Sequence, residues 1–129
     1  MEERSDLAVA KTIRGPIPRI PFEKIALAIL GRRYELSLVI CGDSLARRIN
    51  RTYRQKHYCP SVLSFSLSEN EGEIFLNVRA AAREAKRFKV SLRVRLMHLF
   101  IHACFHLKGY THGTKMETLE AQALRKFKY

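Results

Sequence analysis

Hydrophobic residues alternate with polar or small residues in four segments of the chain, and each of these segments predicts a β-strand. The segments cover residues 7–13, 34–41, 62–67 and 74–78. The alternation is clearest in VLSFSL at 62–67, where small polar residues separate the hydrophobic ones. Prolines and glycines lie between the segments, where they favour turns.

Hydrophobic residues at helical spacing predict five helices. The expected helices cover residues 22–30, about 43–53, 79–88, 92–108 and a last segment from about 115 towards the C-terminus. Ser91 can cap the long helix at its start, and Gly109 can end it. Early strands, with helices between and after them, indicate an α+β or mixed α/β fold. We expect the α+β class, with one domain over residues 1–129 and about four strands in a mixed sheet packed with helices.

The charge balance narrows the choice of partners. The chain has 24 Lys and Arg against 12 Asp and Glu, a formal net charge of +12. Such a charge attracts nucleic acids and anionic membrane surfaces. The membrane alternative is weak, because acids precede the first apolar residues and no segment has the ~20 apolar residues of a spanning helix. We therefore expect a cytoplasmic protein with no membrane partner, in which Cys41, Cys59 and Cys104 are reduced thiols.

Four of the five histidines lie between positions 98 and 112. His98, His102 and His106 are four residues apart, so a helix places them along one stripe. Two neighbours in this stripe can bind one ion, but His98 and His106 would lie about 12 Å apart along the axis. A third ligand must come from outside the helix, and His112 follows Gly109, where the chain can turn back. His102, His106 and His112 thus predict one catalytic zinc ion with an open coordination position.

The other candidate ligands have simpler interpretations. Cys104 should face away from the histidine stripe, and His98 is expected to pack or to support the ligands. His57 has no partner nearby, and the acids at 69–73 are more typical of a solvated turn than of a metal cluster. The histidines could themselves be ordinary surface or core residues, but four at ligand spacing favour a metal site.

Basic residues form two clusters that are free, or nearly free, of acids. They comprise Arg47, Arg48, Arg51, Arg54 and Lys56 in the first cluster, and Arg83, Lys86, Arg87, Lys89, Arg93 and Arg95 in the second. Each cluster alone could be a solvated helix face, whereas two of them are typical of a surface that binds a phosphate backbone. Together with a hydrolytic metal, they favour phosphodiester chemistry.

The segment HACFHLKGYTH at 102–112 resembles the signature H-G-x-L-H-L-x-G-Y-D-H of the YbeY endoribonucleases. Asn50, Tyr53 and Arg54, followed by SVLSF at 61–65 and GEI at 72–74, resemble a second block of that family. The resemblance covers about residues 45–120. It implies a small sheet flanked by helices, with a zincin-like metal-binding helix near the C-terminus and the metal at the mouth of a basic cleft.

The same resemblance implies an activity. The family members are metal-dependent endoribonucleases specific for single-stranded RNA, active in ribosomal RNA maturation and ribosome quality control. Their zinc ligands correspond to His102, His106 and His112, and a functional arginine corresponds to Arg54. The resemblance gives the ribosomal RNA or the small ribosomal subunit as partner, and no small-molecule cofactor. We expect Arg54 to bind the scissile phosphate, since a guanidinium matches phosphate oxygens in bidentate fashion.

Two positions depart from the signature. Ala103 replaces a glycine, and Thr111 replaces an aspartate. If that aspartate orients a ligand, Thr111 lowers metal affinity or rate, typically by about 10–100-fold. The sequence offers no general base, and it leaves open whether a metal-activated water or the 2′-OH of the RNA attacks.

Two other functions fit parts of the pattern. One is a zinc hydrolase with a different substrate, although Ala103 stands where H-E-x-x-H peptidases carry their general base. The other is a non-catalytic ribosome-assembly factor with a structural zinc. A structural site normally has four protein ligands, so that function needs a fourth, for which Glu120 and His98 are the candidates.

Overall fold

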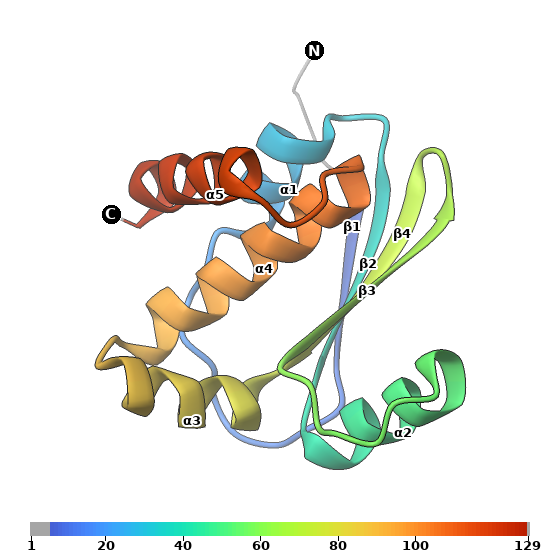
Figure 1. Cartoon of the computed structure of the whole chain (residues 1–129), viewed down its shortest axis with the longest axis vertical. Helices are drawn as coiled ribbons and strands as arrows, with labels where there is room; N and C mark the ends of the chain where they lie inside the picture. Colours follow the sequence, from blue (N-terminus) through green and yellow to red (C-terminus); the bar gives the residue numbers. More distant parts are fainter. Residues whose placement is uncertain (1–5, 129) are drawn as a thin grey trace.

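The computed structural model describes residues 6–128, in which five helices accompany one four-stranded sheet. Along the chain the elements are β1 (Asp6–Lys11), α1 (Phe22–Leu30), β2 (Glu35–Cys41), α2 (Asp43–Arg54), β3 (Val62–Ser68), β4 (Glu71–Asn77), α3 (Val78–Phe88), α4 (Leu92–Lys108) and α5 (Thr114–Phe127). Figure 1 shows α4 crossing one face of the sheet, with α1 and α5 beside it and α2 on the opposite side. The predicted α+β class with a mixed sheet is confirmed.

The sheet has the strand order β1-β2-β4-β3. Strands β1, β2 and β4 are parallel, and β3 pairs with β4 in the antiparallel direction. Two strand boundaries differ from the predicted ones by more than one residue, because β1 ends at Lys11 instead of residue 13 and β4 already begins at Glu71 instead of residue 74. Strand β4 is longer because it pairs with β2 on one side and β3 on the other. Glu71 and Glu73 therefore belong to this strand, and only residues 69–70 form the turn.

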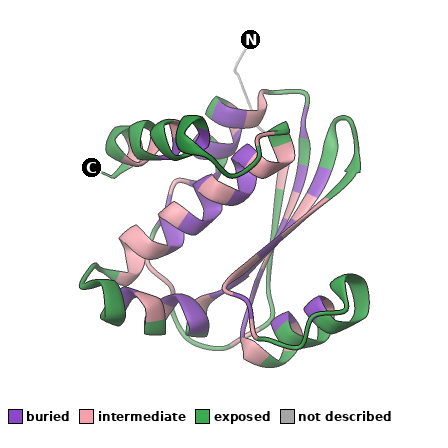
Figure 2. Ribbon diagram, viewed as in Figure 1, coloured by how far each residue is buried: buried purple, intermediate pink, exposed green. Residues whose placement is uncertain are grey.

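Alternate strand residues face two separate cores, as the two-residue period of a strand dictates. Leu36, Leu38 and Ile40 of β2 belong to the larger core, which α1 and α4 cover. Val39 and Cys41 of the same strand belong to the smaller core beneath α2. Figure 2 shows buried residues along the sheet and α4, and exposed residues along the outer faces of α2 and α5.

Helix α4 is the rigid support of the larger core. It is buried on several sides, because α1, α3, α5 and the sheet all contact it. The Ser91 side chain accepts a hydrogen bond from the Val94 N–H, 3.1 Å away, at its first turn. Gly109, with φ of 109°, ends it in the left-handed conformation that glycine adopts at low cost. Neither α4 nor any other helix within residues 6–128 has the length and apolarity that a membrane span requires.

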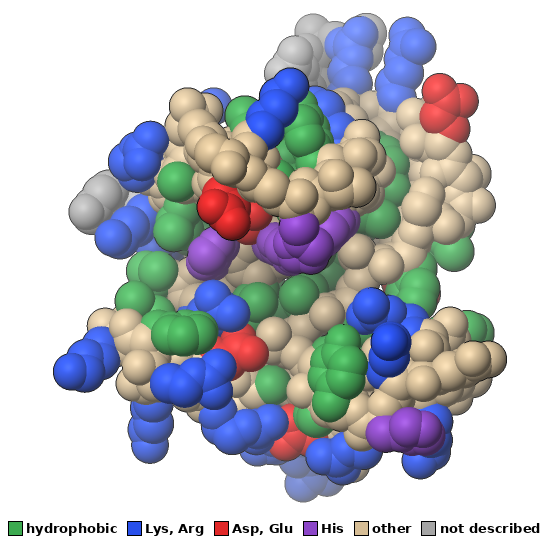
Figure 3. Space-filling model, viewed as in Figure 1, with side chains coloured by type: hydrophobic (Ala, Val, Ile, Leu, Met, Phe, Trp, Pro, Cys, Tyr) green, Lys and Arg blue, Asp and Glu red, His purple; other side chains and the backbone are tan. Residues whose placement is uncertain are grey.

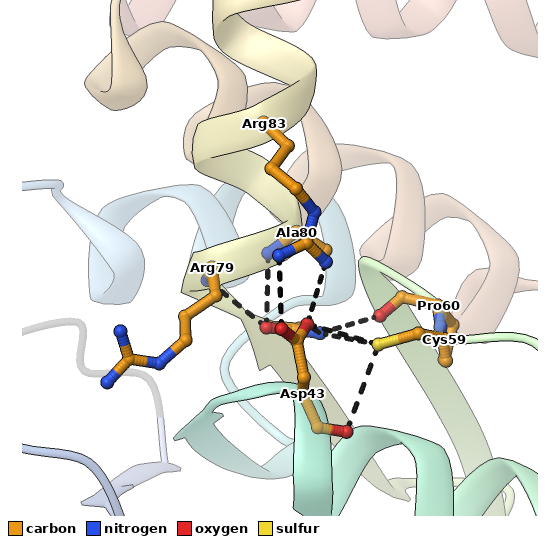
Figure 4. Close-up of polar contacts among 7 residues, drawn as sticks. Asp43, Cys59, Pro60, Arg79, Ala80 and Arg83 are labelled. Atoms are coloured by element: carbon orange, nitrogen blue, oxygen red, sulfur yellow. Dashed lines mark hydrogen bonds and ion pairs between the residues drawn. The ribbon is translucent and has the colours of Figure 1, made fainter.

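A polar cluster at the carboxyl ends of β2 and β4, here called the α2–α3 junction, consists of Asp43, Cys59, Asn77 and Arg83 (Figure 4). The buried Asn77 caps α3 by accepting two backbone N–H groups at 3.1 and 3.2 Å. Its amide donates to Asp43 Oδ1 at 3.0 Å and to the Pro60 carbonyl at 3.1 Å. Arg83 donates to both Asp43 carboxylate oxygens, at 2.8 and 3.0 Å. The junction thus joins α2, α3 and the segment that leads into β3.

Candidate metal centre

The structure brings His102, His106 and His112 together. Each offers one ring nitrogen, and these three atoms all lie within 4.8 Å of one another. The ring centroids are 4.5 Å apart for His102 and His106, 5.2 Å for His102 and His112, and 4.9 Å for His106 and His112. This three-histidine group is the one predicted from the spacing of the sequence.

The local fold explains why three residues from two segments meet. His102 and His106 lie four positions apart on α4, so their side chains leave the same face of the helix. Gly109 ends the helix, and the loop of residues 109–113 turns back before α5 begins. Gly113 has φ of 157° at the other end of this loop, directly after His112. The short loop therefore places His112 beside the two helix histidines.

Glu120 fixes the orientation of His102. This glutamate comes from α5, is only 6% exposed, and has its Oε1 atom 2.9 Å from Nδ1 of His102. A carboxylate accepts hydrogen bonds, so Nδ1 of His102 carries the proton and Nε2 keeps its lone pair. Carboxylates commonly hold metal-binding histidines in this way. The same glutamate oxygen lies 3.4 Å from Nε2 of His98.

The donor set suits a zinc ion. Burial, followed by the nearby His102 and His112, holds the pKa of His106 below its ordinary value, which favours the neutral ring that binds metals. Three imidazoles are the ligand set of several catalytic zinc sites, which keep one position open. Among residues 6–128 no fourth histidine, cysteine, aspartate or glutamate completes this group. The two candidates for a fourth ligand were Glu120 and His98. Glu120 instead contacts Nδ1 of His102, and His98 lies beside the same glutamate oxygen.

The remaining candidates lie outside the group. Cys104 is fully buried in the larger core, where burial raises the pKa of its thiol. His57 is exposed on the segment after α2.

The two positions that depart from the signature lie in different surroundings. Ala103 is 1% exposed and packs in the larger core, so its small side chain fits there. Thr111 is exposed beside His112.

The group borders a cleft of about 620 Å³. All three histidines line it, together with Leu107 of α4, Ser64 and Ser66 of β3, and Arg54 and Tyr58 from the end of α2 and the segment after it. Figure 3 shows histidine side chains at the margin of a hollow in this face, with Lys and Arg side chains on the facing elements. Arg54 is exposed and makes no ion pair within the described part of the chain. Its guanidinium is therefore available to a ligand in the cleft.

The two predicted basic clusters differ in the structure. In the second cluster, Arg83 is bound to Asp43 and Arg95 donates to Glu84 at 2.9 Å. Arg93 donates to the backbone carbonyls of Arg19 and Lys128. These three arginines hold the fold together, which sequence spacing alone did not reveal. The arginines of the first cluster, at 47, 48, 51 and 54, are exposed and form no ion pair among residues 6–128.

Known proteins resemble this chain in sequence and in fold. Residues 17–128 match the model of a protein family described as Endoribonuclease YbeY. The Endoribonuclease YbeY of Aromatoleum aromaticum is 37% identical over 112 residues, which cover 81% of this chain and 73% of that protein. The one from Geobacter metallireducens is also 37% identical over 112 residues, covering 77% and 75%. A solution structure from Thermotoga maritima has a TM-score of 0.63 at 20% identity, covering 81% of this chain and 74% of that one, which supports the fold.

Proposed function

This chain belongs to the YbeY endoribonuclease family, and we propose that it cuts single-stranded RNA in a metal-dependent reaction during ribosomal RNA maturation and ribosome quality control. The observation that carries this proposal is the three-histidine group, which borders a cleft that also holds Arg54. The absence of a fourth ligand within residues 6–128 favours a catalytic zinc over a structural one.

The proposed cofactor is one zinc ion held by His102, His106 and His112. When bound, zinc supplies a Lewis acid that activates water and polarises phosphoryl oxygens. The protein contributes the geometry. Glu120 holds the His102 ring with Nε2 free, and the packing of α4 keeps His102 and His106 at fixed positions. The loop after Gly109 adds His112.

Arg54 is the proposed catalytic residue. It lines the same cleft as the histidines and has no carboxylate partner in the described chain. A free guanidinium can bind two phosphate oxygens at once, and it stabilises the negative charge that grows on them in the transition state. Its neighbours Arg47, Arg48 and Arg51 on α2 would hold the flanking RNA backbone.

The proposed partner is the ribosomal RNA or the small ribosomal subunit, in the cytoplasm.

Metal analysis combined with cleavage of a single-stranded RNA tests this proposal. We expect His106→Ala to lose both bound zinc and cleavage. Arg54→Ala should keep one zinc per chain and lose about 10²–10³ in rate, as when a residue that stabilises transition-state charge is removed. Arg125→Ala, which removes an exposed arginine of α5 outside the cleft lining and outside both basic clusters, serves as the control and should cut nearly as fast as the wild type. Full cleavage by both His106→Ala and Arg54→Ala would show that a contaminating nuclease causes the activity.

A further inference from the structure

Tyr58 is an exposed aromatic residue inside the cleft. Its side chain is 55% exposed, yet it lines the same cavity as the three histidines and Arg54. Tyr53, at 69% exposed, is more open to solvent but is not part of the cleft lining, and its ring instead meets Phe65 edge-on at 6.0 Å. Single exposed hydrophobic residues are common on proteins, so the position of Tyr58 matters more than its exposure.

The segment that carries Tyr58 is held in place on both sides. The side chain of the buried Asn50 donates from Nδ2 to the Tyr58 carbonyl, 3.0 Å away, and the backbone carbonyl of Asn50 accepts the Lys56 N–H at 3.3 Å. The next residue, Cys59, donates from its thiol to Asp43 Oδ1 at 3.1 Å, and the Pro60 carbonyl accepts from the α2–α3 junction (Figure 4). The backbone of Tyr58 is therefore fixed while its ring faces open space, and little ordering remains to oppose ligand binding.

We propose that the Tyr58 ring stacks against an unpaired base of the RNA in the cleft, and that it thereby makes the cleft selective for single strands. This inference rests on the proposed function, since it requires RNA in the cleft. Every base has an apolar face that stacks on aromatic rings, whatever its sequence. In a duplex those faces are covered by neighbouring base pairs, so only an unpaired base can reach the ring.

The electrostatics of the cleft agree with this assignment. Arg54 supplies the positive charge that a phosphate needs, and the polar residues Ser64 and Ser66 on β3 line the same cavity. No aspartate or glutamate lines the cavity within the described residues. A stacking ring next to a free arginine matches the alternation of base and phosphate along a single strand.

Binding of a fluorescein-labelled ten-nucleotide 2′-O-methyl RNA to the full chain, followed by anisotropy, tests the inference. We expect Tyr58→Ala to raise the Kd by between about 5-fold and about 150-fold, the range that stacking of one base covers, whereas Tyr58→Phe stays within about 2-fold of the wild type. Tyr58→Leu, which keeps a bulky apolar group, should bind as poorly as Tyr58→Ala. Tyr53→Ala is the matched control and should bind like the wild type.

Two further probes separate stacking from other roles. A sugar–phosphate decamer without bases should bind the wild type and Tyr58→Ala equally, and the duplex form of the RNA should not distinguish them. The inference is overturned if Tyr58→Ala binds the single strand as tightly as the wild type. It is also overturned if Tyr58→Phe is as weak as Tyr58→Ala, because the hydroxyl would then be the binding group. In both cases RNA cleavage by the wild type would leave the proposed function standing, whereas a wild type that binds no RNA would contradict both.

Discussion

The three-histidine group and the α2–α3 junction are both polar clusters beside the sheet, but they differ in how their atoms are satisfied. In the junction, Asp43, Asn77 and Arg83 bind one another or nearby backbone at 2.8–3.2 Å. In the histidine group only His102 has a side-chain hydrogen-bond partner among residues 6–128, namely Glu120, and the group borders a cleft. A cluster that satisfies itself holds elements together, whereas one that leaves donor atoms facing a cleft can bind a ligand.

Removing the loop ligand gives the largest expected effect and isolates the histidine group. His112→Ala should lower zinc affinity and RNA cleavage by more than about 100-fold. Even the loss of a residue that only orients a metal ligand typically lowers metal affinity or activity by about 10–100-fold. Its melting temperature without metal should stay close to that of the wild type, because His112 is exposed. Metal analysis, cleavage and thermal denaturation measure the three properties. His57→Ala, an exposed histidine outside the group, should change none of them.

In the α2–α3 junction we expect the reverse, namely a loss of stability without a loss of bound zinc. Asn77→Ala removes the cap of α3 and two hydrogen bonds that the Asn77 amide donates, so it should lower the free energy of unfolding by about 2–4 kcal/mol. Urea denaturation measures this loss, and zinc stoichiometry of the folded fraction should remain at one per chain. Asn70→Ala, in the exposed β3–β4 turn, is the control and should stay within about 0.5 kcal/mol. An Asn77→Ala protein as stable as the control would show that the junction does not hold the fold.

A smaller effect on zinc affinity is expected when the contact between Glu120 and His102 is weakened. Glu120→Gln keeps the size of the side chain but removes its charge, so His102 loses a charged acceptor for Nδ1. Zinc affinity should fall by about 10–100-fold, as for other residues that orient metal ligands. Competition with a chromophoric zinc chelator measures this affinity. Glu117→Gln, an exposed position on the same helix, is the control. Equal affinities for both variants would mean that Glu120 does not orient His102.

The smallest effect concerns the pH dependence of the junction. Arg83, helped by Asn77 and Cys59, holds the pKa of Asp43 well below its ordinary value. A lowered pKa gives stability that is fully present above the unfolded-state pKa of about 3.9 and is lost as the pH falls towards the folded-state value. Asp43→Asn should therefore lower the melting temperature at pH 7 and approach the wild type below about pH 4. A difference that persists unchanged at low pH would assign it to lost packing rather than to charge.

Most of the fold could be predicted because local patterns and tertiary packing agree. Periodicity placed the helices and strands within a few residues, and Gly109 ended α4 where expected. The start of β4 at Glu71 could not be predicted, because pairing with β2 and β3 extends it into a segment of turn-forming and acidic residues. At such strand ends, pairing with neighbouring strands outweighs local propensity.

In the candidate site, too, local patterns predicted some residues, whereas the roles of others depend on tertiary packing. The metal group could be predicted because two of its ligands share one helix face and the third follows a helix-ending glycine. The role of Glu120 depends on how α5 packs against α4, which spacing along the chain does not encode. Tyr58 likewise had no signal, since its place in the cleft depends on the bonds from Asn50 and from the junction. Clusters of arginine were also ambiguous, because Arg83 and Arg95 find acid partners only in the folded chain.

The most direct test of the account is a zinc titration of metal-free protein during cleavage of a single-stranded RNA. We predict that cleavage is absent in the metal-free chain, rises in proportion to added zinc and stops rising at one equivalent per chain. Full cleavage by the metal-free protein, or no rise with zinc, would contradict a catalytic ion held by His102, His106 and His112.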